Sequence, residues 1–281
     1  MLSDVVALIS CFDDEAQSGG LFAWDGVRLE QLDDVPTTGL AIHDGALVRV
    51  LRAPESDSFG LVVHGADGPV ELTVEGHDDP HDIVWTGESY AIACAGSNSI
   101  VHVSPAGEQV GIWRAPGEGD AWHLNSLLLV DGQLHVSAFG SFTRHREWNE
   151  PGADPAAGFV LNVATGAKVL TGLYSPHHPR RLGRDWLVCN SGRRALTRID
   201  AATGTVTGDT LLEGWTRGLA SGGETLLVGE SPGRTEPPDV TATLAVVGAA
   251  SLDVVDRFAV PAREIYDIVL APPELVQALR P

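Results

Sequence analysis

Short apolar runs, separated by glycine- and proline-containing turns, extend along almost the whole chain. Such runs, rich in Val, Ile, Leu and Thr, are typical of antiparallel strands joined by hairpins. In one segment the expected strands are 81–84, 90–95, 99–104 and 108–113. A helical pattern is confined to the tail, where 274–279 follows two prolines. The pattern therefore predicts an all-β protein with a short terminal helix.

A four-residue phrase with an apolar frame and a variable polar centre recurs along the chain. Its copies begin at positions 38, 81, 124, 179, 216 and 266. Their spacing of roughly 40 to 50 residues is the period of a four-stranded propeller blade, and each copy would begin the innermost strand of one blade. We expect a single six-bladed β-propeller domain over residues 1–281, with four antiparallel strands per blade.

The two ends of the chain are predicted to share the last blade. Its inner strand would come from 265–270, and its other three strands from 5–11, 20–24 and 27–32. Joining the first and last strands in one sheet closes the ring and removes open sheet edges.

The charge balance limits the classes of partner. The 281-residue chain has 18 Lys and Arg against 38 Asp and Glu, a formal net charge of -20. Nucleic acids and anionic membrane surfaces require clustered cations, so neither is an expected partner. The N-terminus lacks the pattern of a secretion signal, no apolar run reaches the roughly 20 residues needed to span a bilayer, and three cysteines are not a disulfide framework. We expect a cytoplasmic protein, and its oligomeric state is left open.

If the ring closes, the polar centres of the six phrases meet around one axis. These centres are Gly39, Asp82, Asn125, Arg180, Arg217 and Asp267. Half of the ten histidines lie just before or at the start of the expected inner strands: His77, His81, His123, His177 and His178. Imidazole, carboxylate and amide groups can ligate a divalent metal, and histidine exchanges protons near neutral pH.

These residue types define the candidate site. The expected catalytic residues are His81, His123, His178, Asp82, Arg180, Arg217 and Tyr266. The expected substrate-binding residues are Trp122, His177, Asn190, Arg193, Glu230 and Trp148. The expected ligands of a divalent metal (Ca, Mg or Zn) are Asp82, Asn125 and Asp267. Both arginines suit an anionic group, because guanidinium binds carboxylate and phosphate through a planar fork. No nucleotide or flavin fingerprint is present.

Two long insertions are expected on the same face as this ring. One spans 143–158 and carries Trp148, and the other spans 231–241 and carries Arg234. Long loops on a rigid scaffold often serve as binding loops or lids, which is the role we expect here.

The blade pattern resembles the six-bladed propellers of the gluconolactonase, senescence-marker-protein and NHL-type group. It is more closely similar to a little-characterised bacterial propeller family, through the motifs at 122–125 (WHLN), 175–180 (SPHHPR), 190–192 (NSG), 216–219 (TRGL) and 265–267 (IYD). The lactonase resemblance implies an ion held by a first-blade carboxylate, an Asn and a later Asp. Asn125 and Asp267 match the last two, but Gly39 stands where the first carboxylate would be.

These observations lead to three hypotheses for function. The leading one is an enzyme, a hydrolase or lyase of lactonase type, acting on an anionic or polyhydroxylated metabolite at the propeller mouth, with or without a divalent metal. The second is a non-catalytic propeller that binds a ligand or a protein. The third is a cyclase or isomerase that uses the cavity mainly for its shape. Fold alone does not decide among them.

Overall fold

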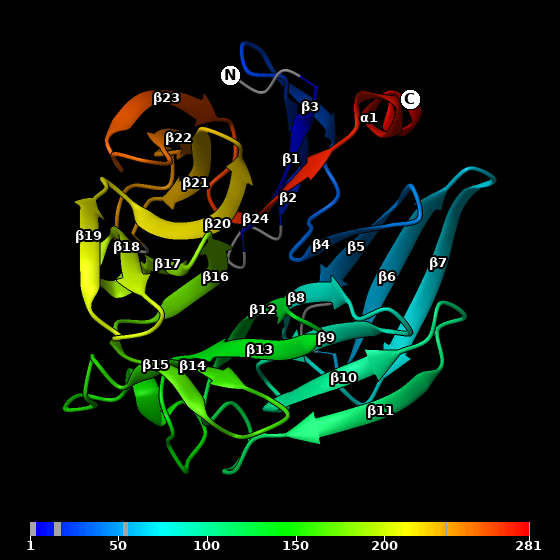
Figure 1. Ribbon diagram of the computed structural model, residues 1–281. Coiled ribbons are helices and arrows are strands. Elements are labelled where there is room, and N and C mark those ends of the chain that lie inside the picture. Colours follow the sequence, from blue (N-terminus) through cyan, green and yellow to red (C-terminus); the bar gives the residue numbers. More distant parts are fainter. Residues whose placement is uncertain (1–3, 14–17, 53–55, 234, 281) are drawn as a thin grey trace.

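A computed structural model describes residues 4–13, 18–52, 56–233 and 235–280. Six four-stranded antiparallel sheets surround a central axis (Figure 1). The only α-helix in the described part is α1 (Pro273–Leu279), which follows the last strand. The predicted all-β six-bladed propeller is therefore confirmed.

Each blade is a meander that runs from the axis outward. The first comprises β4 (Leu40–His43), β5 (Ala46–Arg52), β6 (Ser58–Gly65) and β7 (Gly68–Glu75), and the second β8 (Pro80–Trp85), β9 (Tyr90–Cys94), β10 (Ser99–Val103) and β11 (Gln109–Arg114). The third comprises β12 (Leu124–Val130), β13 (Gln133–Ala138), β14 (Gly158–Asn162) and β15 (Lys168–Leu173). The fourth comprises β16 (Pro176–Leu182), β17 (Asp185–Asn190), β18 (Ala195–Asp200) and β19 (Val206–Leu211). The fifth comprises β20 (Trp215–Gly222), β21 (Thr225–Ser231), β22 (Ala242–Gly248) and β23 (Val254–Val260).

The sixth blade joins the two ends of the chain, as predicted. Its order is β24 (Ile265–Ala271), β1 (Val6–Asp13), β2 (Ser18–Trp24) and β3 (Leu29–Asp33). β24 and β1 pair antiparallel, with Ile9 opposite Ile268 and Ser10 opposite Asp267. The Ser10 hydroxyl accepts a hydrogen bond from Asp267 N at 3.0 Å and donates one to the Thr38 carbonyl just before β4. One hydroxyl thus links the closing blade to the first.

The hydrophobic core lies between blades rather than in one central mass. Six buried apolar clusters occur in the described residues, and each draws on two neighbouring sheets. Successive side chains of β1 illustrate the cause, because a strand points alternate residues to opposite faces. Ile9 packs toward the fifth blade, whereas Leu8 packs toward the first. Both faces of each sheet are therefore buried.

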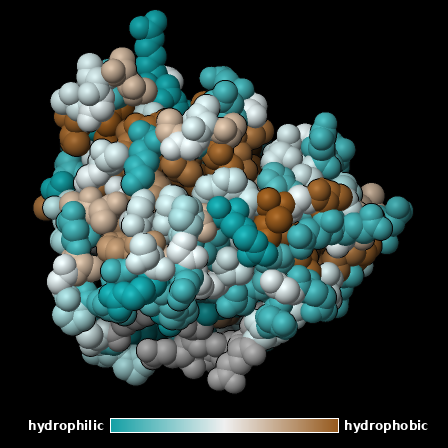
Figure 2. All heavy atoms as spheres, turned by 90° about the horizontal axis from the view of Figure 1, so that it is seen from below, coloured by the Kyte–Doolittle hydropathy of each residue, from teal (hydrophilic) through white to brown (hydrophobic). Residues whose placement is uncertain are grey.

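The outermost strands form the rim of the wheel. They carry exposed apolar residues, among them Val110 on β11, Leu211 on β19 and Val255 on β23. Figure 2 shows one side of the surface, where hydrophilic side chains predominate and hydrophobic ones emerge in separate groups. The cysteines Cys11, Cys94 and Cys189 are buried and unpaired, and burial raises the pKa of each thiol.

The structure departs from expectation at the start of β16. The sequence predicts this inner strand over 180–182, but it begins at Pro176. A bulge between His177 and Arg180 accommodates the additional residues, and His178 adopts φ 42° there. A bulge inserts an extra residue and re-aims the side chains beside it.

Both insertions are found at their predicted places, between the second and third strands of the third and fifth blades. The first contains a single 3₁₀ turn at Glu147–Asn149. Arg234 of the second lies outside the described residues. No helix in the described residues has the length and apolarity that crossing a membrane would require.

Ring closure through β24 makes a direct prediction for a truncated chain. Deleting residues 265–281 removes the strand that pairs with β1 and opens two interblade clusters, so we expect loss of cooperative thermal unfolding. Circular dichroism melting would measure this. Deleting residues 280–281 is the control. Among the contacts that the structure describes, this shorter deletion removes mainly an exposed Arg280–Glu30 ion pair, which contributes about 1 kcal/mol or less to stability. A cooperative melt of the longer deletion near the wild-type temperature would contradict the closure argument.

Candidate functional site

Two ring aspartates tie neighbouring inner strands together in the same way. Asp82 on β8 accepts hydrogen bonds from Ile83 N at 2.8 Å and from Leu127 N on β12 at 2.7 Å. Asp267 on β24 accepts from Ile268 N at 2.7 Å and from Leu40 N on β4 at 3.0 Å. Both carboxylates are buried. Each one joins its own blade to the next, so both have a structural use that the sequence did not reveal.

Gly39, the first-blade ring residue, lies directly against this arrangement. A Cβ at position 39 would stand 2.8 Å from Asp82 Cα, closer than side chains tolerate. The missing first-blade carboxylate is therefore a packing requirement of this ring.

His178 lies beside the two aspartates. Its Nδ1 accepts a hydrogen bond from Gly218 N at 3.0 Å, and its Nε2 lies 3.0 Å from Asp267 Oδ1. A ring nitrogen that accepts from an amide carries no proton, so the neutral ring has its proton on Nε2. Burial, the largest cause, lowers the pKa of His178. Nε2 of the neutral imidazole therefore lies beside the Asp267 carboxylate, but it makes no hydrogen bond of good geometry with any described residue.

The two aspartates differ in protonation. Burial and the nearby charge of Asp267 hold the pKa of Asp82 well above its usual range. Burial acts in the same direction on Asp267, but His178 and Arg180 outweigh it and lower the pKa of that carboxyl. The two carboxyls therefore favour one proton held at Asp82 and a negative charge at Asp267.

The metal prediction can be compared with these contacts. Ligand atoms of Asp82, His178 and Asp267 lie within 4.8 Å of one another. Asn125, the third predicted ligand, instead accepts a hydrogen bond from His81 Nδ1 at 2.8 Å. A metal ligand needs a nitrogen lone pair, whereas His178 Nε2 carries the proton. In this arrangement the cluster fits a pair of carboxyls that share one proton better than a metal centre, and a bound metal stays a prediction.

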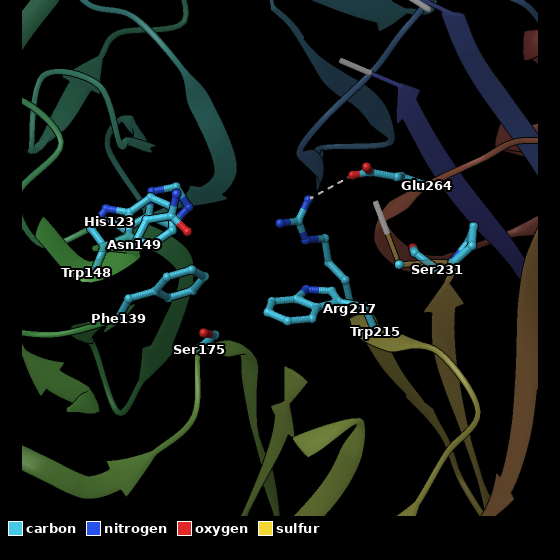
Figure 3. A pocket seen from close by; sticks show the side chains of 11 residues that line it. His123, Phe139, Trp148, Asn149, Ser175, Trp215, Arg217, Ser231 and Glu264 are labelled. Atoms are coloured by element: carbon cyan, nitrogen blue, oxygen red, sulfur yellow. Dashed lines mark ion pairs between the residues drawn. The ribbon is translucent and has the colours of Figure 1, made fainter. Parts of the chain in front are cut away.

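A separate cavity of about 390 Å³ opens nearby and is lined by residues of the third, fourth, fifth and sixth blades (Figure 3). It combines three aromatic side chains with groups that can bind charge or exchange protons. The residues that line it are His123, Phe139, Trp148, Asn149, Ser175, Trp215, Arg217, Ser231, Pro232, Gly233 and Glu264. Trp148 and Asn149 come from the first insertion, and Pro232 and Gly233 from the second. Both insertions thus contribute to its wall, as expected for binding loops.

Arg217 is the most informative residue of this cavity. It is 8% exposed, and its guanidinium lies over the Tyr266 ring with Cζ 4.2 Å from the ring centroid. Nη2 donates to His177 Nε2 at 3.0 Å, whereas Nε and Nη1 have no hydrogen-bond partner among the described residues. Buried donors without partners cost about 1–3 kcal/mol each, more when charged. An anionic ligand would satisfy them.

The neighbouring His177 is held neutral. Burial, followed by the charge of Arg217, lowers its pKa well below the usual value. Its Nδ1 donates to the Ser175 carbonyl at 3.0 Å, which leaves Nε2 to accept from Arg217. His177 therefore orients the arginine.

Across the cavity, His123 forms a dyad with Asp120. Nδ1 of His123 donates to Asp120 Oδ1 at 2.9 Å, and no hydrogen bond joins Nε2 to any residue that the structure describes. Trp148 and Phe139 enclose the ring, with centroids at 4.2 and 4.3 Å. Burial lowers the pKa of His123, although Asp120 opposes the shift. A neutral imidazole backed by a carboxylate is suited to acid–base chemistry.

Asp120 was not among the predicted residues, although its spacing of three positions before His123 was a usable signal. It also anchors the first insertion, because its carbonyl accepts from Arg146 N at 2.9 Å and from Trp148 Nε1 at 3.1 Å. Phe139, Trp215 and Glu264 were also absent from the predicted site, although Trp215 and Glu264 directly precede the TRGL and IYD motifs.

Of the predicted residues, His123, Arg217 and Trp148 line the cavity. Tyr266 and His177 contact Arg217. His81 lies beside His123 at 5.1 Å between ring centroids, but both its nitrogens face oxygen acceptors, on Asn125 at 2.8 Å and Asp79 at 3.0 Å.

The other predicted substrate residues contact the protein itself. Trp122 packs between blades against Phe159. Asn190 accepts from Tyr174 N at 2.7 Å. Their polar or aromatic groups hold the scaffold.

Three predicted charged residues are likewise paired within the protein. Glu230 accepts from Glu213 N at 2.7 Å and from Arg257 Nε at 3.1 Å. Arg193 pairs with Asp209 at 3.0 Å. Arg180 donates through Nε to the Leu219 carbonyl at 3.0 Å and does not line the cavity with Arg217. A clamp of two arginines is therefore not what the cavity presents.

Comparison with protein families gives one match. Residues 69–273 match the profile described as a domain of unknown function, DUF4915. The chain belongs to this family. The five motifs that suggested a bacterial propeller family all lie within the matched range. No curated protein sequence matches.

Solved structures show the same fold at low identity. The chain is similar to a propeller in the nidogen/laminin complex (TM-score 0.68, 12% identity, covering 95% of this chain and 98% of that one). It is also similar to a protein of unknown function from Bacteroides caccae (TM-score 0.62, 14% identity, 96% and 99% covered) and to a Lactobacillus plantarum protein (TM-score 0.59, 14% identity, 95% and 99% covered). At these identities the likeness establishes the fold alone.

The acid pair predicts a distinctive pH dependence of stability. Because the pKa of Asp82 is raised in the folded state, its contribution is fully present below the ordinary aspartate pKa and is lost as the pH rises through the folded value. Asp82→Asn removes this titration but also one acceptor of a buried amide, costing roughly 1–3 kcal/mol. We expect the deficit of the variant to shrink as pH increases from about 4 to about 9. Urea unfolding at each pH measures it.

The stability deficit of Asp267→Asn should depend on pH in the opposite direction. The lowered pKa of Asp267 gives stability that is present above the ordinary aspartate pKa and lost in acid, so this variant's deficit should be largest at neutral pH. Exposed Asp239→Asn is the control. Parallel pH curves for all three variants would rule out the acid pair.

Proposed function

We propose that this protein is an enzyme that acts on a small metabolite with an anionic group, bound in the cavity by Arg217, and that His123 exchanges a proton with it. Hydrolysis or elimination is the reaction class, as the resemblance to lactonase propellers also suggests. The observation that carries the proposal is the pair of unsatisfied buried donors on Arg217 at the wall of the cavity.

The anion-binding part of the proposal rests on pre-organisation. His177 fixes one nitrogen of Arg217, and the Tyr266 ring supports the guanidinium from its face. The free donors are thus held in place before a ligand arrives, which reduces the entropy lost on binding. Charge-assisted hydrogen bonds to a carboxylate or phosphate are about twice as strong as neutral ones.

The proton-transfer part rests on the dyad. Asp120 holds the Nδ1 proton of His123, which leaves the Nε2 lone pair for a substrate or a water molecule. As a base, His123 would activate water for attack on an ester or lactone, or remove a proton from carbon in an elimination. The conjugate acid would then protonate the leaving group.

A protein-docking role is less well supported by the shape of the face. A flat surface with exposed tryptophans would favour it, but Trp148 donates its Nε1–H to Asp120 and packs on His123 and Phe139. Trp215 and Phe139 face the cavity from opposite sides in Figure 3. An enclosed volume of this size suits a small molecule.

Arg217→Met tests the anion site. We expect malonate, gluconate or inorganic phosphate to raise the melting temperature of the wild type, and the variant to bind the responding anion at least about tenfold more weakly, since charged hydrogen bonds contribute roughly 1.5–3 kcal/mol. Thermal shift and isothermal titration calorimetry measure both effects. Arg184→Met is the matched control, because it removes the same charge from the exposed β16–β17 turn. Equal affinities of the two variants would refute the site.

His123→Asn tests the proton transfer. Asparagine tolerates the positive φ of 51° at this position and retains an N–H for Asp120, but it lacks Nε2. With glucono-1,5-lactone and other lactones monitored by proton release, we expect turnover to fall roughly 100-fold or more. The wild-type rate should persist below the ordinary histidine pKa, because burial lowers the pKa of His123 and keeps the base deprotonated.

Asp120→Asn should move the acid limb of that pH profile to still lower pH, since the carboxylate raises the pKa of His123. A limb that moves toward neutral pH, or an unchanged rate in His123→Asn, would exclude His123 as the base.

A further inference from the structure

The cavity contains a negative charge beside Arg217. Glu264, which precedes β24, also lines the wall, and its Oε2 lies 3.8 Å from Arg217 Nη1 (Figure 3). That separation is too long for a hydrogen bond. The side chain of Glu264 is 20% exposed. The two charges therefore stand side by side, and Arg217 keeps donors that Glu264 does not use.

A ligand with only an anionic group would be less well matched to this pair than one that also carries a positive group. Its anion, when bound to Arg217, would lie close to the Glu264 carboxylate, and like charges at short range are unfavourable. The mismatch disappears if the ligand carries a positive group next to its negative one. A carboxylate with an adjacent ammonium meets that requirement.

The remainder of the wall combines polar groups with a set of aromatic side chains. Phe139, Trp148 and Trp215 supply aromatic surface, and Ser175 lies near them in Figure 3. Such surface stabilises an apolar group of the ligand by removing it from water. The volume of about 390 Å³ limits the ligand to a compact molecule.

We propose that the cavity recognises a zwitterion of the α-amino-acid type with an apolar or aromatic side chain. Its carboxylate binds Arg217, its ammonium binds Glu264, and its side chain lies among Phe139, Trp148 and Trp215. This inference rests on the proposed small-molecule site and names the class of its ligand.

Three probes that share one phenyl group test it: L-phenylalanine, 3-phenylpropionate, which lacks the ammonium, and 2-phenylethylamine, which lacks the carboxylate. Binding is measured by isothermal titration calorimetry and by the fluorescence of the cavity tryptophans. We expect the wild type to bind L-phenylalanine at least about tenfold more tightly than either analogue, because each analogue lacks one charged hydrogen bond to the protein.

The variants separate the two charges. Glu264→Gln should weaken the binding of L-phenylalanine and strengthen the binding of 3-phenylpropionate, whereas Arg217→Met should weaken the binding of both. Glu88→Gln, in the exposed β8–β9 turn, and Arg184→Met are the matched controls. Preference for 3-phenylpropionate in the wild type, or an unchanged L-phenylalanine affinity in Glu264→Gln, would overturn the zwitterion.

The outcomes also separate this inference from the proposed function. If 3-phenylpropionate binds better than L-phenylalanine and Arg217→Met abolishes that binding, the anion site stands and the zwitterion fails. If no probe binds, the zwitterion fails, and the anion titrations decide the site independently. Tight binding of L-phenylalanine by a protein that turns over none of the lactones supports the zwitterion and counts against lactone hydrolysis.

Discussion

The pairing of β24 with β1 is the constraint on which the rest of the structure depends. Each blade buries both faces of its sheet against its neighbours, so no blade is complete while the ring is open. The structure concentrates polar contacts at this seam. Ser10 and Asp267 connect the two terminal strands to the first blade through a hydroxyl and a carboxylate. The same strand also carries Tyr266 and Asp267 to the centre, so the strand that closes the ring also contributes to the candidate site.

The residues at the six equivalent ring positions have different roles. Asp82 and Asp267 use one geometry twice to join inner strands, and Gly39 provides the space that one of them needs. Arg217 occupies the same place in its own blade but turns toward a cavity. Insertions in the third and fifth blades create this difference, because they add walls on one side of an otherwise regular wheel. The cavity thus lies where the repeat is interrupted by insertions.

The sequence predicted the fold well for a simple reason. Strand alternation and blade period are regularities that can be read along the sequence. They correctly predicted the β24–β1 closure and the positions of the two insertions. The site was predicted only in outline. Arg217, His123 and Trp148 line the cavity, whereas the side chains of Trp122, Asn190 and Glu230, which were assigned to substrate, contact other residues of the protein. A residue type determines what a side chain can bind. Its neighbours in space determine whether its polar groups are already hydrogen-bonded within the protein. Glu264 gained its importance from such neighbours, whereas for Asp120 the spacing of three positions before His123 was a usable signal.

Glu230 and Arg217 differ in how far the fold itself satisfies their charged groups. Removing a charged group from water is unfavourable unless hydrogen bonds or an opposite charge replace the lost hydration. The fold supplies those replacements in full for the carboxylate of Glu230, through an amide and an arginine. It supplies Arg217 with one hydrogen bond, to His177, and with the Glu264 carboxylate at 3.8 Å, but Nε and Nη1 have no hydrogen-bond partner in the described part of the chain. The proposed ligand would satisfy these donors. The neighbouring Glu264 restricts what that can be, because it disfavours a bare anion at the place where Arg217 attracts one.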